Sequence, residues 1–311
     1  MGSFRLRLPA TSANLGAAFD TAAVALSFHL TVEAEESERF SIVATGRDVE
    51  LCSRLDDNLI LETYRRLLER EGRKAVPLAM KMDNQIPLGM GCGSSAAGRL
   101  AAVALAVHFG GLGWTGDQIL AEACALEGHP DNAAACWLGG MVVAACEDRV
   151  VHFARVEPPA DWRVMVVSPR DPLATSHARA VLPNRYSRAD AVANIQAASL
   201  LGLAFAQGRG DLLRVAMADR IHQPYRAAMC PLLPLLLPLA GQEGILGVAL
   251  SGAGPSVLLI LSGGEAVPGA TIAVAEALAG QAEVEVANVE FERLGGLESF
   301  QELSSQAASR S

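Results

Sequence analysis

The sequence predicts an α+β protein of two domains, with residues 1–160 in the first and residues 161–311 in the second. Of the 311 residues, 51% are hydrophobic, which supplies enough apolar side chains for one large domain or two moderate ones and excludes a disordered chain. The chain opens with strand-like alternation, continues with helical patterns, and ends in the order strand, loop, strand, helix, strand. Strands and helices that segregate along the chain in this way are typical of α+β folds.

Alternating and apolar segments define the elements expected in the first domain. Strands are expected at residues 4–8, 24–34, 40–44, 78–82 and 141–145. Asp57 is the expected N-cap of a helix that runs to about residue 70. Further helices are expected at residues 94–109 and 115–126 and from Pro130 onward.

The second domain is expected to begin between residues 150 and 175. In the second half of the chain, strands are expected at residues 150–155, 163–168, 245–250, 257–261 and 284–291. Its helices are expected at residues 187–207, 211–218 and 270–279. The tail after Gly296, rich in Ser, Gln and Glu, is expected to fray.

Charge composition argues for a soluble metabolic protein. The chain has 34 acidic against 25 basic residues, a net charge of −9, which gives a nucleic-acid surface little support. Lys74 and Lys81 are the lysines and every other cation is Arg, so recognition of an anion is expected to fall to Arg. No signal-peptide pattern opens the chain, and the most apolar segment, residues 94–109, is too short for a membrane span. We therefore expect a cytoplasmic protein with no membrane or nucleic-acid partner.

The cysteines are scattered without a CxxC pair, which favours reduced, buried thiols over disulfides or zinc ligation. They are Cys52, Cys92, Cys124, Cys136, Cys146 and Cys230.

One glycine-rich segment has the order of residues that a phosphate-binding loop needs. Three alternating glycines precede two serines and a long helical run, so backbone N–H groups and a helix N-terminus can face one anion. The alternative is a plain connector with Ser94 as a simple N-cap. No Gly-Lys pair exists for a Walker A loop, and Ser94 lacks the flanking glycines of a hydrolase elbow. The segment comprises Pro87, Leu88, Gly89, Met90, Gly91, Cys92, Gly93, Ser94, Ser95, Ala96 and Ala97.

Three further segments carry polar or glycine residues at predicted bends. Residues 9–20 form a small-residue bend that carries Asn14 and Asp20 and that could admit a ligand or be an ordinary turn. Residues 127–132 place His129, Asp131 and Asn132 in one short bend between two predicted helices. Asp131 there could equally be a helix cap. Residues 250–256 contain Gly252 and Gly254 and could either cover bound phosphates or only connect two strands.

Magnesium is the metal that these segments could hold. It prefers oxygen ligands and shares them with nucleotide phosphates, so a single carboxylate would suffice. The candidates are Glu127 or, one helical turn earlier, Glu122, together with the hydroxyl of Ser94. His129 is a poor candidate because no second His or Cys has suitable spacing.

Taken in this order, the segments resemble the signature motifs of the GHMP kinases, the family of galactokinase, homoserine kinase, mevalonate kinase and phosphomevalonate kinase. Residues 87–97 resemble its phosphate-binding loop and residues 251–255 its third, glycine-rich motif. Within the family the similarity is greatest to the members that phosphorylate homoserine. It is carried by residues 9–20, 127–132 with Leu138-Gly139-Gly140, and His222-Gln-Pro-Tyr-Arg226.

The resemblance implies a fold, a reaction and a partner. The N-terminal domain would resemble the second domain of ribosomal protein S5, the C-terminal domain would be ferredoxin-like, and ATP would lie between them with Mg²⁺. The γ-phosphate would pass to the side-chain hydroxyl of L-homoserine, giving O-phospho-L-homoserine and ADP in threonine biosynthesis. A homodimer is implied as well. Two alternatives stay open, namely another small alcohol as acceptor and a non-catalytic homologue that senses a nucleotide or metabolite.

The resemblance also implies roles for single residues. The phosphate loop, with Gly252 and Gly254, would hold the nucleotide. Residues around the acceptor and the transferred phosphate would be Asn14, Asp20, His129, Asp131, Asn132, Thr175, Arg179 and Arg226. Of these, we expect Asn14, Asp20, Asp131, Asn132 and Arg179 to take part in catalysis. One departure from the family pattern is that Ala17-Ala18 stands where Pro-Gly is usual.

Overall fold

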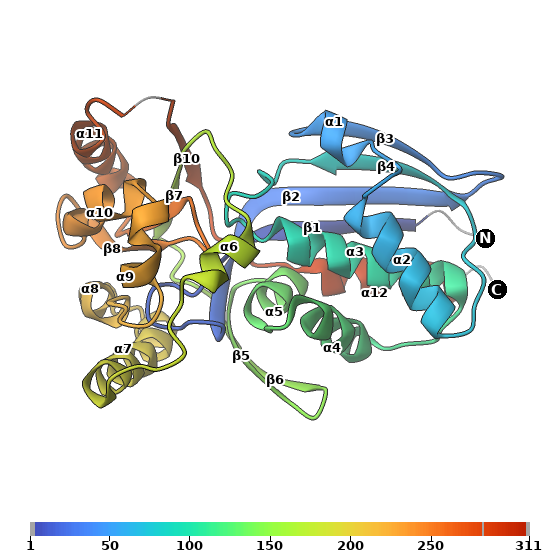
Figure 1. Ribbon diagram of the computed structural model, residues 1–311, viewed down its shortest axis with the longest axis horizontal. Helices are drawn as coiled ribbons and strands as arrows, with labels where there is room; N and C mark the ends of the chain where they lie inside the picture. Colours follow the sequence, from blue (N-terminus) through green and yellow to red (C-terminus); the bar gives the residue numbers. More distant parts are fainter. Residues whose placement is uncertain (1–3, 282, 309–311) are drawn as a thin grey trace.

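The computed structural model describes residues 4–281 and 283–308 and shows two β-sheets, each with its own helices, placed side by side (Figure 1). The first sheet has the strand order β3-β4-β2-β5-β6, and β1 pairs with β2 outside this path. Among the pairings of described strands in this sheet, that of β3 with β4 is the parallel one. The strands are β1 (Phe4–Ala13), β2 (Ala22–Glu36), β3 (Ser41–Gly46), β4 (Leu78–Asn84), β5 (Met141–Glu147) and β6 (Val150–Val156).

The strand β1 runs further than its alternation predicts and ends beside the second sheet. Its first half alternates buried and exposed residues, whereas every residue from Leu8 to Ala13 is buried. A register shift at Pro9/Ala10 separates the two halves of its pairing with β2. Beyond the shift the strand is covered on both faces, so period-2 alternation is lost and the sequence pattern understates its length.

The second sheet is antiparallel and has the strand order β10-β7-β9-β8. Numbered within this sheet, the order is fourth, first, third, second, which is the ferredoxin-like arrangement that the family resemblance implies. The strands are β7 (Arg163–Ser168), β8 (Ile245–Leu250), β9 (Val257–Leu261) and β10 (Glu285–Val289).

The helices fall into two sets. On the first sheet are α1 (Val49–Cys52), α2 (Leu59–Arg70), α3 (Ser94–Gly110), α4 (Gly116–Glu127), α5 (Asp131–Leu138) and α12 (Gly296–Ala308). With the second sheet are α6 (Thr175–Ala180), α7 (Arg188–Gln207), α8 (Leu213–Ala216), α9 (Gln223–Arg226), α10 (Leu232–Leu236) and α11 (Val267–Ala277), and short 3₁₀ turns at residues 210–212, 227–229, 237–239 and 264–266. In the described chain α7 alone is long and apolar enough to cross a membrane, a test that core helices of soluble proteins also pass.

The helix α3 is the buried centre of the first domain. Twelve of its residues are buried, among them a continuous stretch from Leu100 to Val107, and it packs between α2, α4 and the face of β1. Small alanines let these helices approach closely, so the helix that begins at the phosphate loop is held rigidly.

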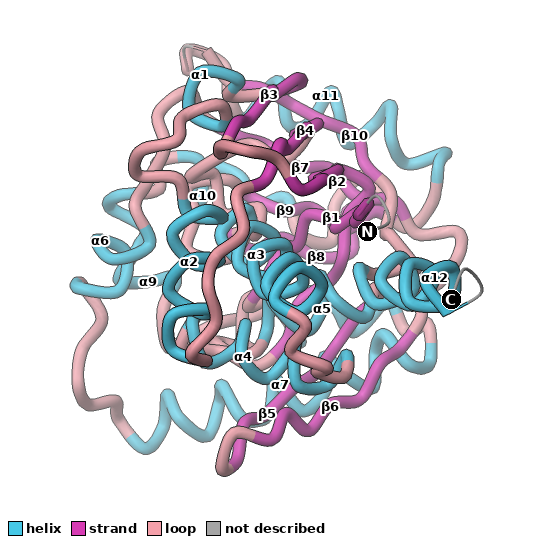
Figure 2. The backbone as a smooth tube through the Cα atoms, turned by 90° about the vertical axis from the view of Figure 1, so that its right-hand side faces the viewer, coloured by secondary structure: helices cyan, strands magenta, loops and turns pink. Residues whose placement is uncertain are grey.

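The chain end corrects one sequence expectation. The segment after Gly296 was expected to fray, but it forms α12, which packs against β1 and α5 (Figure 2). Leu26 forms an isolated bridge with Phe291, which brings the chain back to the first sheet. Trp137 packs its ring 5.8 Å from that of Phe300. The polar composition of the tail hid this contact because only one face of α12 meets the core.

Two smaller expectations are also wrong. The N-cap of α2 is Asn58, whose side chain accepts from the N–H groups of Ile60 and Leu61 at 3.1 and 3.2 Å, whereas Asp57 precedes it with a positive φ of 55°. All six cysteines are free, but Cys146 is exposed where a buried thiol was expected.

Candidate active site

One cavity between the two sheets collects residues from all four polar and glycine-rich segments and from the segments around α6 and α9. The predicted site residues that line it are Asn14, Asp20, Gly89, Gly91, Gly93, Ser94, Ser95, Glu127, His129, Asp131, Asn132, Thr175, Arg179, Arg226 and Gly252. These residues lie far apart in the sequence, and the docking of the two sheets brings them to one place.

Several predicted residues do not line this cavity. Ala96 and Ala97 are fully buried in α3, and Cys92 is buried under the loop. Pro87, Leu88 and Met90 line a different cavity, which Arg47 and Glu285 also border. Gly254 lies against Cys230, where an added Cβ would come within 2.7 Å of the thiol sulfur.

Glu122, the alternative candidate for magnesium, does not line this cavity. Its carboxylate accepts two hydrogen bonds from Arg70, at 2.7 and 3.0 Å, on the surface between α2 and α4. Glu122 and Glu127 are separated by about 1.4 turns of α4, so they lie on different faces of the helix, with Glu122 outside the cleft and next to a cation.

The phosphate loop is closely packed on both sides. Gly91 and Gly93 have φ values of +75° and +72°. A Cβ on Gly91 would lie 2.1 Å from the carbonyl oxygen of Ser251, and one on Gly93 would lie 1.9 Å from Oγ1 of Thr11. Glycine is therefore required at both positions by conformation and by space.

The helix α3 begins directly from this loop. Its N-cap is Gly93 and makes no side-chain capping bond, so Ser94 is not the simple cap of the alternative interpretation. The N–H groups of an uncapped first helical turn, together with the helix dipole, favour an anion there. The loop can therefore bind phosphate.

Backbone hydrogen bonds join the loop to both domains. The N–H of Thr11 donates to the carbonyl oxygen of Cys92 at 3.0 Å, and the N–H of Leu173 donates to that of Gly89, also at 3.0 Å. The N–H of Gly252 donates to Ala13 at 3.1 Å. The loop is thus held by β1 and by the segment before α6, and β1 in turn is bonded to the third glycine-rich segment.

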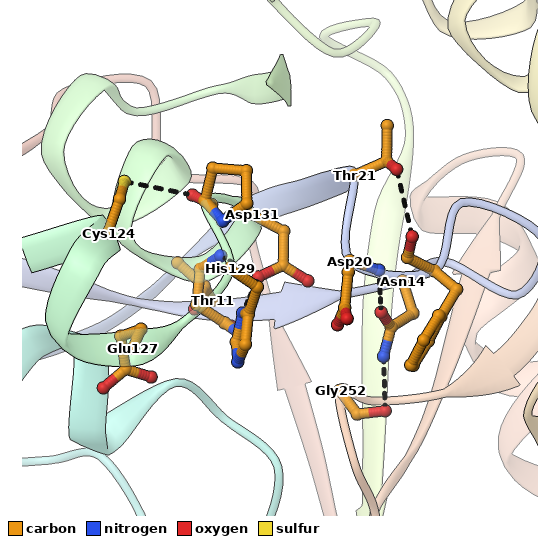
Figure 3. Close-up of polar contacts among 12 residues, drawn as sticks. Thr11, Asn14, Asp20, Thr21, Cys124, Glu127, His129, Asp131 and Gly252 are labelled. Atoms are coloured by element: carbon orange, nitrogen blue, oxygen red, sulfur yellow. Dashed lines mark hydrogen bonds and ion pairs between the residues drawn. The ribbon is translucent and has the colours of Figure 1, made fainter. Parts of the chain in front are cut away.

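Asn14 shapes the bend that carries Asp20. Its Nδ2 donates to the carbonyl oxygen of Gly252 at 2.7 Å, and its Oδ1 accepts from the N–H of Asp20 at 2.9 Å (Figure 3). Asn14, Gly16 and Asp20 have positive φ values of 70°, 77° and 54°. Ala18 keeps a negative φ, so the alanine that replaces the usual glycine is accommodated without strain.

Asp20 and Arg179 place opposite charges on the wall of the cavity. Nη1 and Nη2 of Arg179 donate to the two carboxylate oxygens of Asp20 at 3.0 and 2.6 Å. Their side chains are 30% and 37% exposed, so both stay accessible from the cleft. The Arg179 guanidinium also lies 5.5 Å from the ring centre of Phe19.

His129, Asp131 and Asn132 form a second polar cluster at the junction of α4 and α5. Asp131 is buried, and its Oδ1 lies 2.5 Å from Nδ1 of His129 and accepts from the N–H of Asn132 at 2.7 Å. Thr11 donates its hydroxyl to Oδ1 of Asn132 at 2.6 Å. Burial alone would lower the pKa of His129, but the hydrogen bond to Asp131 and the charge of its carboxylate outweigh it and raise that pKa. Figure 3 shows His129 and Asp131 across the cleft from Asp20.

Two sets of groups could hold a cation. Ligand atoms of Asp20, His129 and Asp131 lie within 4.8 Å of one another, but each of these side chains already makes a hydrogen bond within the site. Glu127 lies in the cleft beside the serines: the hydroxyl of Ser95 donates to its Oε2 at 2.9 Å. A carboxylate beside serine hydroxyls offers the oxygen donors that Mg²⁺ prefers. Nε of Arg99 lies 2.5 Å from the other oxygen of Glu127, so a bound cation would share that carboxylate with Arg99.

A second cavity, which the sequence did not reveal, shares Ser94 and Ser95 with the first. Its other walls come from α1, α2 and β4 and are mostly apolar, including Leu51, Leu59 and Met82. In the sequence these residues have the pattern of ordinary core and helix-capping residues. Their position beside the phosphate loop, which the tertiary structure determines, is what makes them candidate ligand contacts. The segment with α6 was also not predicted as a helix, although its Thr175 and Arg179 were predicted site residues.

Comparison with known proteins identifies both halves of the chain. The family model of the GHMP kinases N terminal domain matches residues 58–140, and that of the GHMP kinases C terminal domain matches residues 203–277. The homoserine kinase of Solibacter usitatus is 44% identical over 262 residues, covering 84% of this chain and 86% of that protein. The homoserine kinase of Deinococcus radiodurans is 40% identical over 255 residues, covering 82% and 83%.

Solved structures agree with these relatives. The homoserine kinase of Cytophaga hutchinsonii superimposes with a TM-score of 0.80 at 25% identity, covering 95% of this chain and 96% of that one. The Streptococcus pneumoniae phosphomevalonate kinase, solved with phosphomevalonate and AMPPNP, has a TM-score of 0.68 at 14% identity, covering 94% and 100%, and shares the fold.

Proposed function

This chain belongs to the GHMP kinase family and, within it, to the homoserine kinases, and we propose how its cleft carries out their reaction. The enzyme is an ATP-dependent kinase that transfers the γ-phosphate to the side-chain hydroxyl of L-homoserine, giving O-phospho-L-homoserine and ADP. The reaction belongs to threonine biosynthesis.

The observation that carries our assignment of the acceptor site is the pair of Asp20 and Arg179. Both face the cavity that the phosphate loop lines. An amino acid at neutral pH carries an ammonium group and a carboxylate. On binding, homoserine would separate Asp20 from Arg179 and form an ion pair with each. Asp20 would bind its ammonium group and Arg179 its carboxylate. A planar guanidinium suits a carboxylate because it donates two parallel hydrogen bonds.

Arg226 supplies a second cation to the same cavity, and the hydroxyl of Thr175 is a further donor at its edge. The Arg226 side chain is buried and aimed at the cleft, so it would take either the acceptor carboxylate or the transferring phosphate. Two guanidinium groups facing one small cavity also favour an anionic acceptor over a neutral sugar or simple alcohol.

The nucleotide would lie across the phosphate loop. Its phosphates would accept from the backbone N–H groups of Gly91, Gly93 and the first turn of α3, with Gly252 closing the other side. The base and sugar would fill the mostly apolar cavity beyond Ser94 and Ser95. The two cavities share Ser94 and Ser95, so a nucleotide bound in this way would place its γ-phosphate near the acceptor.

Glu127 and Ser94 would hold Mg²⁺, because both are oxygen donors on the acceptor side of the loop. The ion would offset negative charge on the nucleotide phosphates. Glu127 also accepts from Ser95, which fixes the orientation of its carboxylate in advance.

The protein's contribution to the chemical step is positioning and charge stabilisation. Asp131 lies close to Asp20, and Asn132 lines the same cavity; both would orient the acceptor hydroxyl toward the γ-phosphate. A loose transition state demands little proton abstraction before transfer, so none of these carboxylates has to act as a formal base. The bond between Asp131 and His129 keeps that carboxylate in place.

The test is an ADP-release assay with magnesium and ATP against L-homoserine, L-threonine, L-serine, mevalonate and galactose. Two truncated acceptors sharpen it: 4-hydroxybutyrate lacks the ammonium group and 3-aminopropan-1-ol lacks the carboxylate. We expect turnover of homoserine and a large loss of kcat/KM with each truncated acceptor. Equal turnover of homoserine and 3-aminopropan-1-ol would contradict the carboxylate site on Arg179 and Arg226.

We further infer a homodimer and a cytoplasmic location from the family, without a nucleic-acid or membrane partner. Both inferences depend on the resemblance. Sedimentation of the purified protein tests the first of them, and a monomer would contradict it.

A further inference from the structure

Arg226 differs from Arg179 and Arg99, the other arginines near the cleft, because its guanidinium has no carboxylate partner among the described residues. Arg179 is paired with Asp20, and Arg99 lies against Glu127. Across the described residues, no carboxylate oxygen lies within 4 Å of the Arg226 guanidinium, although its side chain is only 1% exposed.

The partners of Arg226 are all neutral. Its Nε donates to the carbonyl oxygen of Ala178 at 3.0 Å, and its Nη1 lies 3.3 Å from that of Gly252 and 3.1 Å from Nδ1 of His222. A buried guanidinium held in this way is fixed in direction but keeps its full charge. Burial and the charge of Arg179 lower the pKa of Arg226, which is consistent with a cation that awaits an anion.

His222 must be neutral to serve both of its neighbours. Its Nε2 lies 2.9 Å from the carbonyl oxygen of Gly16, which only accepts, so Nε2 carries the hydrogen. Its Nδ1 then has a lone pair for Nη1 of Arg226, which only donates. The ring is fully buried and stacks on Phe19, with ring centres 5.2 Å apart. One tautomer therefore satisfies all of these contacts.

The carboxylate of Asp219 lies near His222, but it does not take the place of Gly16 as the hydrogen-bond partner of the ring. Oδ2 of Asp219 lies 3.7 Å from Nε2 of His222, but the same oxygen already accepts from the N–H groups of His222 and Gln223 at 2.9 and 2.6 Å. It caps the start of α9, the helix that carries Arg226, and leaves the imidazole to bond with Gly16.

We propose that His222 is a positioning residue, whose neutral imidazole fixes Arg226 in the cleft without cancelling the charge that binds the anionic acceptor. The inference rests on the proposed role of Arg226. A carboxylate at the same place would orient the guanidinium equally well, but it would compete with the substrate anion for its charge. A neutral acceptor gives orientation and leaves the charge available.

Three substitutions at residue 222 separate orientation from charge. His222→Asn keeps a neutral acceptor near the position of Nδ1, and His222→Asp places a charged acceptor of the same shape there. His222→Gln puts its amide near Nε2 and removes the acceptor for Arg226. His29→Gln is the matched control, because His29 is also a buried, doubly bonded histidine but lies away from the cleft.

The readouts are KM for homoserine, KM for ATP and kcat, with the melting temperature recorded for each variant. We expect His222→Asp and His222→Gln to raise KM for homoserine about tenfold or more, as for the loss of a charged hydrogen bond, while KM for ATP stays unchanged. His222→Asn and His29→Gln should stay within about threefold of the wild type. Equal KM values for the Asn and Asp variants would overturn the inference.

A measurement on the unaltered protein guards against variants that fail to fold. The ¹⁵N chemical shifts of the His222 ring at neutral pH should show a protonated Nε2 and a bare Nδ1. An imidazolium or the other tautomer would overturn the inference. Failure of the wild type to phosphorylate homoserine would instead contradict the proposed function, so the two failures are distinguishable.

Discussion

The hydroxyl oxygen of Ser251 lies 2.8 Å from the carbonyl oxygen of Gly91, so the third glycine-rich segment is hydrogen-bonded to the phosphate loop. The same hydroxyl lies 2.9 Å from that of Ser12 at the end of β1. Ser251 is fully buried, and it joins three segments that are distant in the sequence. The shape of the phosphate loop therefore depends on the second domain as well as on its own glycines.

Substituting Ser251→Ala should loosen the loop. The half-buried carbonyl of Gly91 would lose its donor, which costs about 1 kcal/mol of stability. KM for ATP should rise because the loop amides are no longer held in place. Ser256→Ala is the control, since Ser256 is equally buried and bonds Ser168 at 2.7 Å within the second domain. A similar rise of KM for ATP in both variants would contradict a specific role for Ser251.

Substituting Gly91→Ala should abolish ATP binding. The added Cβ would lie 2.1 Å from the carbonyl oxygen of Ser251, so the loop or the neighbouring segment must move. Gly111→Ala, at the other end of α3, has a similar φ of +62° with nothing within 4 Å of the added atom. It should cost only about 1–2 kcal/mol of stability, for the left-handed backbone. Titration with ATP, followed calorimetrically, compares the two variants, and normal binding by Gly91→Ala would refute the steric argument.

Glu127 and Glu122 should respond differently to removal of their charge. Glu127→Gln should lower kcat/KM by on the order of 100-fold and raise the magnesium concentration needed for half-maximal rate. Glu122→Gln removes only a surface pair with Arg70 and should leave both quantities unchanged. Activity measured over a magnesium titration distinguishes them. A magnesium requirement that shifts in Glu122→Gln and not in Glu127→Gln would reverse our assignment.

Acidification should weaken the fold through His222. Burial lowers the pKa of His222 below its ordinary value, and the positive charge of Arg226 lowers it further. The negative charge of Asp219 raises this pKa but does not outweigh burial. Below the ordinary histidine pKa of about 6.5, the unfolded chain binds a proton that the folded one refuses. The stability that the neutral His222 ring contributes is therefore fully present above about pH 6.5. It is lost as the pH falls toward the pKa of His222 in the folded protein.

Urea unfolding at pH 7.5, 6.5 and 5.5 tests this pH dependence. The wild type should lose more unfolding free energy on acidification than His222→Asn, because the variant has no group to protonate at this position. The charge of Asp20 also acts on His222, so Asp20→Asn provides a control for that contribution. Equal losses in the wild type and in His222→Asn would show that folding does not lower the pKa of His222.

Local patterns predicted most of the secondary structure and the phosphate loop. Alternating glycines before a helix-forming run predict the cradle because backbone conformation and the helix N-terminus are local properties. Local patterns also predicted α3 and the order of the last elements of the second sheet, β8, β9, α11 and β10. They failed at α12, where the polar face dominated the composition and the apolar face was visible only once it met Trp137 and β1.

The sequence by itself determined which residues can bind phosphate, carry charge and bend the chain, because steric freedom and side-chain chemistry belong to single residues and their neighbours. The partners of those residues were decided by the tertiary structure alone. Asn14 bonds to Gly252, Asp20 pairs with Arg179, and Glu122 turns to Arg70 while Glu127 stays in the cleft. These contacts join segments far apart in the chain, and they exist only where the helices of the first domain pack together and its sheet docks against the second.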